Sequence, residues 1–136
     1  MDDKTKLLKG SPSRDTFKQA HKSLSNSFYA CDIDFVFVGN HPPGIIAFLD
    51  FKLPRDTVTF SEVLAYNDLL QLAPVYIVEA SDPANGPFKV ARYTRGVINA
   101  YPRPPTITLE PVGTFCDLAV FGEWERKIRN AARRGA

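Results

Sequence analysis

The chain has too few cysteines to be held together by disulfide bonds. It contains only two, Cys31 and Cys116, which lie far apart in the sequence and form no Cys-x-x-Cys pair. A thiolate zinc site is therefore disfavoured. We expect both to be free, buried thiols in a reducing compartment.

Long apolar runs are also missing. No stretch approaches the roughly 20 apolar residues that a membrane-spanning helix needs. The chain starts with Met-Asp-Asp-Lys and has no apolar signal-peptide segment behind it. We therefore expect a cytoplasmic protein that has no membrane partner.

Several catalytic signatures are absent as well. The sequence has no Gly-x-x-x-x-Gly-Lys-Ser/Thr loop, no Gly-x-Gly-x-x-Gly after a strand and no Gly-x-Ser-x-Gly elbow. Its two histidines, one of them in a proline-rich turn, make a poor zinc set. These absences argue against nucleotide-binding loops, nucleophile-elbow hydrolases and zinc enzymes.

The length and composition of the chain suit a single domain. With 136 residues and 44% apolar content, the chain can bury a core without disulfides or a structural metal. We expect a single domain over residues 1–136, with a flexible segment at 1–10, a core motif region at 13–80, and extra strands and a C-terminal helix at 88–136. A net charge of +2 permits contact with polyanions but does not require it.

Apolar periodicity and turn residues predict an α/β (α+β) fold, a central mixed sheet flanked by helices. A capping-box pattern, Thr59-Phe-Ser-Glu62, opens the second helix, and Pro74 ends it. The sequence predicts helices at 11–24, at 59–72 and from 118 onward. It predicts strands at 28–38 (one bent strand or two short ones), 44–53, 75–78, 88–93 and 106–112.

Two neighbouring predicted strands carry carboxylates. Asp50 and Lys52 share one strand face, as do Asp32 and Asp34, because side chains alternate along a strand. If 39–44 closes a hairpin, a pairing with an index sum of 84 sets Asp34 opposite Asp50 and Asp32 opposite Lys52. Opposed carboxylates repel one another unless a positive charge lies between them, and Mg²⁺ or Mn²⁺ prefers such oxygen ligands. The alternative is that these strand ends simply meet solvent, with Lys52 paired to Asp32.

The order helix, strand, strand with Asp34, strand with Asp50-Phe51-Lys52, helix and buried strand resembles the PD-(D/E)XK nuclease superfamily, which has the restriction-endonuclease-like fold. The resemblance covers roughly residues 13–80. It implies that Asp34 and Asp50 bind one or two magnesium ions and that Lys52 attends the attacking water. Ile33 stands where the family has proline, and Asp50 replaces the commoner glutamate. Whether Asp32 or Asp34 is the ligand stays open.

Further residues have competing explanations. Glu62 lies on the helix after the site, where some nucleases place another carboxylate, but the capping box explains it equally well. His21 lies on the apolar stripe of the first helix, where a packed histidine is commoner than a catalytic one. A nucleic-acid-binding role is the minority interpretation of a set of basic residues near the N-terminus and on the late strand, Arg14, Lys18, Lys22, Arg92 and Arg95.

These observations lead to two hypotheses. The first is a Mg²⁺- or Mn²⁺-dependent endonuclease or junction-resolvase-type enzyme that hydrolyses DNA, with a homodimer implied by the resemblance alone. The second is a catalytically inactive nuclease-like fold that works as a nucleic-acid or protein-binding module.

Overall fold

The computed structural model describes residues 13, 15–16, 19–20 and 33–134. The chain divides into two compact units, residues 1–30 and 31–136, and the described strands belong to the second. The described residues of the first predicted helix (13, 15–16 and 19–20) are helical. Five of the candidate site residues named above lie outside the described residues: Arg14, Lys18, His21, Lys22 and Asp32.

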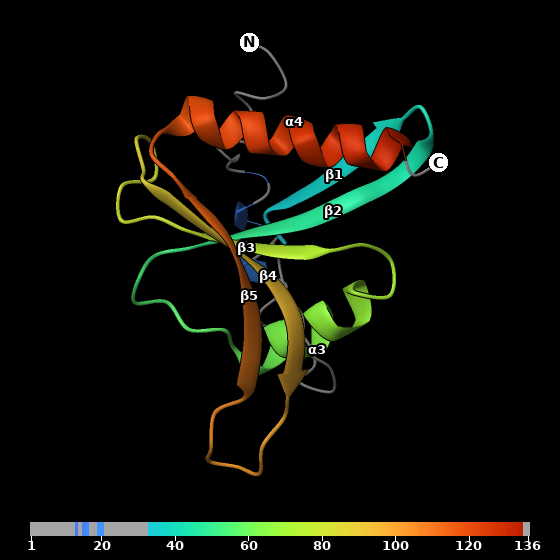
Figure 1. Ribbon diagram of the computed structural model, residues 1–136. Coiled ribbons are helices and arrows are strands. Elements are labelled where there is room, and N and C mark those ends of the chain that lie inside the picture. The colour runs from blue at the N-terminus through green and yellow to red at the C-terminus, as the bar shows by residue number, and fades with distance from the viewer. Residues whose placement is uncertain (1–12, 14, 17–18, 21–32, 135–136) are drawn as a thin grey trace. The chain divides into compact units, whose positions relative to one another are not determined.

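Five strands form one mixed sheet in the order β1-β2-β3-β4-β5 (Figure 1). β1 and β2 form an antiparallel hairpin, β2 and β3 are parallel, and β4 and β5 continue the sheet in antiparallel pairs. The predicted mixed α+β architecture is therefore confirmed. The elements are β1 (Phe35–Asn40), β2 (Pro43–Lys52), α3 (Phe60–Leu69), β3 (Val75–Glu79), β4 (Phe88–Val97), β5 (Thr106–Phe115) and α4 (Leu118–Arg134).

Helix α3 connects the parallel strands β2 and β3 and begins at the predicted capping box. The Thr59 side chain accepts the backbone N–H of Glu62, and the Glu62 side chain accepts the backbone N–H of Thr59. The helix ends at Leu69, three residues before the predicted end. The last turn tightens there because the N–H of Leu72 bonds the carbonyl three residues earlier, that of Leu69, at 2.9 Å.

The two faces of the sheet are covered by different helices. On one face, Tyr66 of α3 packs with Phe48, Val75, Ile77 and Tyr93. We call this the α3 face.

On the opposite face, the α4 face, Phe121 packs with Leu49, Val78, Phe88 and Val90. Trp124 adds an edge-to-face contact with Tyr76 at 5.0 Å between ring centroids. The predicted helix from residue 118 onward is therefore confirmed, and in Figure 1 α4 and α3 lie on either side of the sheet.

The structure corrects two further predictions. β4 continues to Val97 and β5 to Phe115, beyond the predicted ends, because backbone pairing continues past the residues with a clear apolar pattern. Cys116 is exposed rather than buried, because it lies in the bend between β5 and α4. Cys31 lies outside the described residues.

Candidate functional site

Asp50 is the buried charged residue at the centre of the site. Its side chain is only 3% exposed. It lies on β2 between Leu49 and Phe51, which pack on the α4 face, so alternation along the strand turns Asp50 toward α3. A carboxylate buried this deeply needs hydrogen-bond donors around it.

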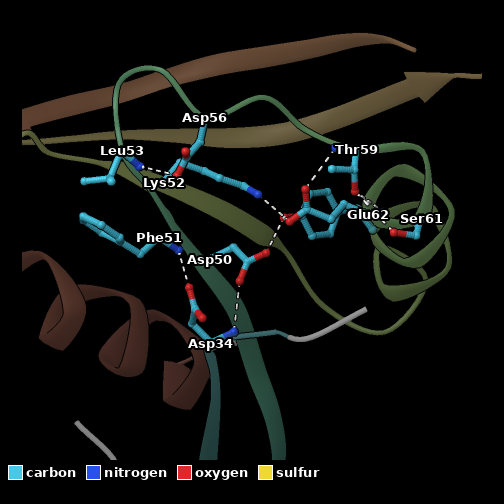
Figure 2. A network of polar contacts seen from close by, with 10 residues as sticks. Asp34, Asp50, Phe51, Lys52, Leu53, Asp56, Thr59, Ser61 and Glu62 are labelled. Carbon is cyan, nitrogen blue, oxygen red and sulfur yellow. Dashed lines mark hydrogen bonds and ion pairs between the residues drawn. The ribbon is translucent and has the colours of Figure 1, made fainter. Parts of the chain in front are cut away.

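Two hydrogen bonds hold Asp34 against the end of β2, one to the side chain of Asp50 and one from the backbone of Phe51. The backbone N–H of Asp34 donates to Oδ1 of Asp50 at 2.9 Å, and the backbone N–H of Phe51 donates to Oδ2 of Asp34 at 2.8 Å (Figure 2). Asp34 lies in the bend just before β1, and its side chain is exposed. The two aspartates are 16 positions apart in the sequence, and the hairpin brings them together.

The predicted hairpin register is confirmed where it concerns the site. Phe35 pairs with Leu49 and Phe37 pairs with Ala47, both with an index sum of 84, which points Asp34 toward Asp50. A register shift between Phe37 and Val38 changes the pairing nearer the turn. This irregularity takes up one residue at the turn and leaves the register beside Asp50 unaltered.

Lys52 lies on the same sheet face as Asp50 and reaches α3. Its ammonium forms an ion pair with Oε2 of Glu62, and both side chains are largely buried (Figure 2). Oε1 of the same carboxylate accepts the backbone N–H of Thr59 at 2.9 Å. Glu62 therefore caps the helix with one oxygen and holds the site lysine with the other.

Tyr66 completes the site, although the sequence pattern did not single it out. Its hydroxyl donates to Oδ2 of Asp50 and lies 3.2 Å from Oε2 of Glu62. Its ring is fully buried and meets Tyr93 edge to face. The sequence did contain a signal, because Glu62 and Tyr66 are four residues apart and so lie on one helix face.

Burial dominates the electrostatics of Asp50. Desolvation raises the pKa of its carboxyl from the ordinary value of 3.8 to about 6. The hydrogen bonds from Tyr66 and from the backbone of Asp34 oppose this rise, while the negative charge of Asp34 adds to it. The positive charge of Lys52 also opposes the rise, but burial outweighs all of these contributions.

The pKa values of Glu62 and Tyr66 are shifted in opposite directions. Burial raises the pKa of Glu62, but the bonds from Lys52 and Thr59 outweigh it, and the net pKa is lowered. Burial and the bond to Asp50 raise the pKa of Tyr66, so the phenol keeps its proton and acts as a donor.

The donor set fits a divalent cation that keeps water or phosphate ligands. Mg²⁺ is commonly held through one or two carboxylates, with other oxygens completing its six ligands. Oδ1 of Asp34 accepts no hydrogen bond from the described residues, and each oxygen of Asp50 keeps a second lone pair. Within the described ranges, no group of three or more His, Cys, Asp or Glu side chains could hold a metal ion. An ion at Asp34 and Asp50 would therefore need water or phosphate oxygens to complete its ligands.

The predicted basic residues on β4 are not brought to this site. Arg92 pairs with Tyr76, whose ring packs on the α4 face, and cross-strand partners share a face. Gly96 faces α3, because an added Cβ there would meet Tyr93 and Val63. Its neighbour Arg95 therefore points to the α4 face as well.

No protein-family model, curated protein or solved structure matches this chain. In the part of the chain that the structure describes, no helix has both the length and the apolar character that spanning a bilayer requires.

Proposed function

We propose that this chain is a metal-dependent phosphodiesterase of the nuclease type that acts on DNA and has a restriction-endonuclease-like fold. One observation carries the proposal. The backbone N–H of Asp34 donates to Asp50 and the backbone N–H of Phe51 donates to Asp34, so the two carboxylates are held side by side. Lys52 projects from the same face of β2 as Asp50. The parallel β2–α3–β3 unit also supports the fold assignment.

In this proposal the carboxylates of Asp34 and Asp50 hold one Mg²⁺ or Mn²⁺ ion. When bound, the ion would polarise a phosphoryl oxygen and lower the pKa of the attacking water. Lys52 would donate to that water or to the phosphoryl oxygen where negative charge develops. Glu62 orients the ammonium of Lys52, and the Tyr66 hydroxyl orients the carboxylate of Asp50.

Cleavage of duplex and branched DNA with wild-type protein tests this function. We expect cleavage with Mg²⁺ or Mn²⁺, none in EDTA, and a loss of at least about 100-fold in Asp50→Ala, since the variant removes a ligand of the ion. Asp68→Asn changes an exposed acidic residue of α3 and is the matched control. Equal cleavage by wild type and Asp50→Ala, or cleavage that persists in EDTA, would contradict the proposal.

A second candidate is a catalytically inactive nuclease-like fold that binds nucleic acid or protein. The closed polar network favours it, because both oxygens of Asp50 accept protein hydrogen bonds and Lys52 already has a carboxylate partner. In the described part of the chain, every buried side-chain nitrogen and oxygen atom has a hydrogen-bond partner. Such a module would show no response to Mg²⁺ at this site.

A further inference from the structure

A row of charged residues crosses the sheet beside the candidate site. Lys52 on β2 is in register with Glu79 on β3, and Glu79 is in register with Lys89 on β4. At the usual spacing of neighbouring strands, the backbones of Lys52 and Lys89 are about 10 Å apart. The row therefore leads from the site toward the β4 side of the sheet.

Lys89 shares the α3 face with Asp50 and Lys52. Its neighbours Phe88 and Val90 are both buried in the cluster on the α4 face, so alternation turns Lys89 to the opposite side. The side chain is exposed. Neither motif spacing nor charge clustering singled out this residue in the sequence.

The ammonium of Lys89 is available to an anion. Among the described residues, the ion pairs within 4.0 Å do not include one between Lys89 and Glu79, its nearest acidic neighbour in the row. Lys52, by contrast, is occupied by Glu62. Exposed lysines with free ammonium groups contact phosphates as point charges.

We infer that Lys89 binds the phosphodiester backbone of the substrate. From the candidate site the bound strand would extend across the ends of β2, β3 and β4 on the α3 face. The inference rests on the proposed function, because it assumes that a nucleic acid occupies the site. It also assigns a direction to the bound strand. The strand runs across the sheet from Asp50 past Lys52 to Lys89, and the α4 face, which carries Arg92 and Arg95, stays free of it.

Fluorescence anisotropy of a short fluorescein-labelled DNA duplex, in Ca²⁺ and over a series of salt concentrations, tests the inference with the full chain. We expect Lys89→Ala to weaken binding by about three-fold or more and to lower the slope of log Kd against log salt by about one, as for one lost phosphate contact. Lys89→Arg should keep the affinity and the salt dependence of wild type. Arg92→Ala is the matched control, since it removes a charge three residues away on the other face and should leave both values unchanged.

Three outcomes would overturn the inference: equal effects of Lys89→Ala and Arg92→Ala, unchanged affinity in Lys89→Ala, and no binding by wild-type protein. If Lys89 serves only as a structural partner of Glu79, Lys89→Ala should lower the free energy of unfolding and leave DNA affinity intact. Cleavage of the DNA is measured in a separate assay. If cleavage depends on metal but Lys89→Ala leaves DNA affinity unchanged, the proposed function is retained and the role of Lys89 is rejected. If Lys89→Ala weakens DNA binding but the wild type cleaves no DNA, the role of Lys89 is retained and catalysis is rejected.

Discussion

Asp50 carries a conflict between burial and charge that no other described residue matches. Among the described residues, Asp50 is the only charged residue that is buried. Its ionised form lies beside a second carboxylate, that of Asp34. Tyr66 and the backbone of Asp34 relieve the conflict only in part, since the pKa stays near 6. A cation bound at this point would remove it, which is the physical reason for proposing that this pair holds a metal ion.

Without metal, the stability of the protein should depend on pH through Asp50. Because the pKa is raised from 3.8 to about 6 on folding, the stabilising contribution is complete below pH 4 and is lost as pH rises through 6. We expect the free energy of unfolding to fall by about 1–3 kcal/mol between pH 4.5 and 7.5. Urea unfolding in EDTA measures it, with Asp50→Asn as the variant that lacks the titrating group. Parallel pH profiles for the two proteins would count against this account.

At the scale of elements, α3 joins fold stability to site geometry. Its first turn contains Glu62, which serves the helix cap and the lysine at once. One turn later, Tyr66 reaches Asp50. A shift of the helix along the sheet would break both contacts together, so the cap also sets the position of the site residues.

The two roles of Glu62 can be separated by substitution. Thr59→Ala removes the cap acceptor and should cost about 1 kcal/mol of unfolding free energy. Glu62→Gln keeps an oxygen for the N–H of Thr59, as capping boxes accept glutamine, but removes the charge paired with Lys52. The amide NH2 of the glutamine would then face the largely buried ammonium of Lys52, and a buried charge left without its partner is strongly destabilising. Urea titrations should therefore show a larger loss for Glu62→Gln than for Thr59→Ala.

Metal-ion assays complete this comparison. Thr59→Ala should keep the response of wild type to Mn²⁺, because the ion ligands are unchanged. If Thr59→Ala proved the more destabilising of the two, the cap rather than the ion pair with Lys52 would be the main contribution of Glu62.

At the scale of the whole molecule, the hairpin and the sheet hold the acidic residues together before any ion binds. The β1–β2 hairpin sets Asp34 against Asp50, and the core on both faces holds β2 in place. The repulsion between the two carboxylates is therefore a cost of the folded state. An ion that binds the folded state alone raises its stability by mass action.

Thermal melts should show this coupling directly. Millimolar Mg²⁺ or Mn²⁺ should raise the Tm of wild type, and Asp50→Ala should lose the increase. In EDTA, Asp34→Asn should raise the Tm slightly, because it removes one of the two charges while an amide oxygen can still accept the N–H of Phe51. An inactive binding module predicts neither effect. A lower Tm for Asp34→Asn in EDTA would mean that the negative charge of Asp34 stabilises the fold.

Much of the site could be predicted because it depends on short-range rules. The alternation of side chains on a strand places Asp50 and Lys52 on one face. The length of the hairpin places Asp34 beside Asp50, and the capping box places the start of α3. Each of these follows from the period of an element or from the geometry of a turn, which neighbouring residues determine.

The contacts between elements were decided only by the tertiary structure. Tyr66 reaches Asp50, Glu62 reaches Lys52, and Lys89 joins the row of Lys52 and Glu79 because of how α3 lies on the sheet and which strands are neighbours. The irregularity beside Thr94 likewise turns Arg95 away from α3. The sequence alone thus determined which residues share an element face. Which faces meet depends on packing of the whole core, summed over many residues far apart in the chain.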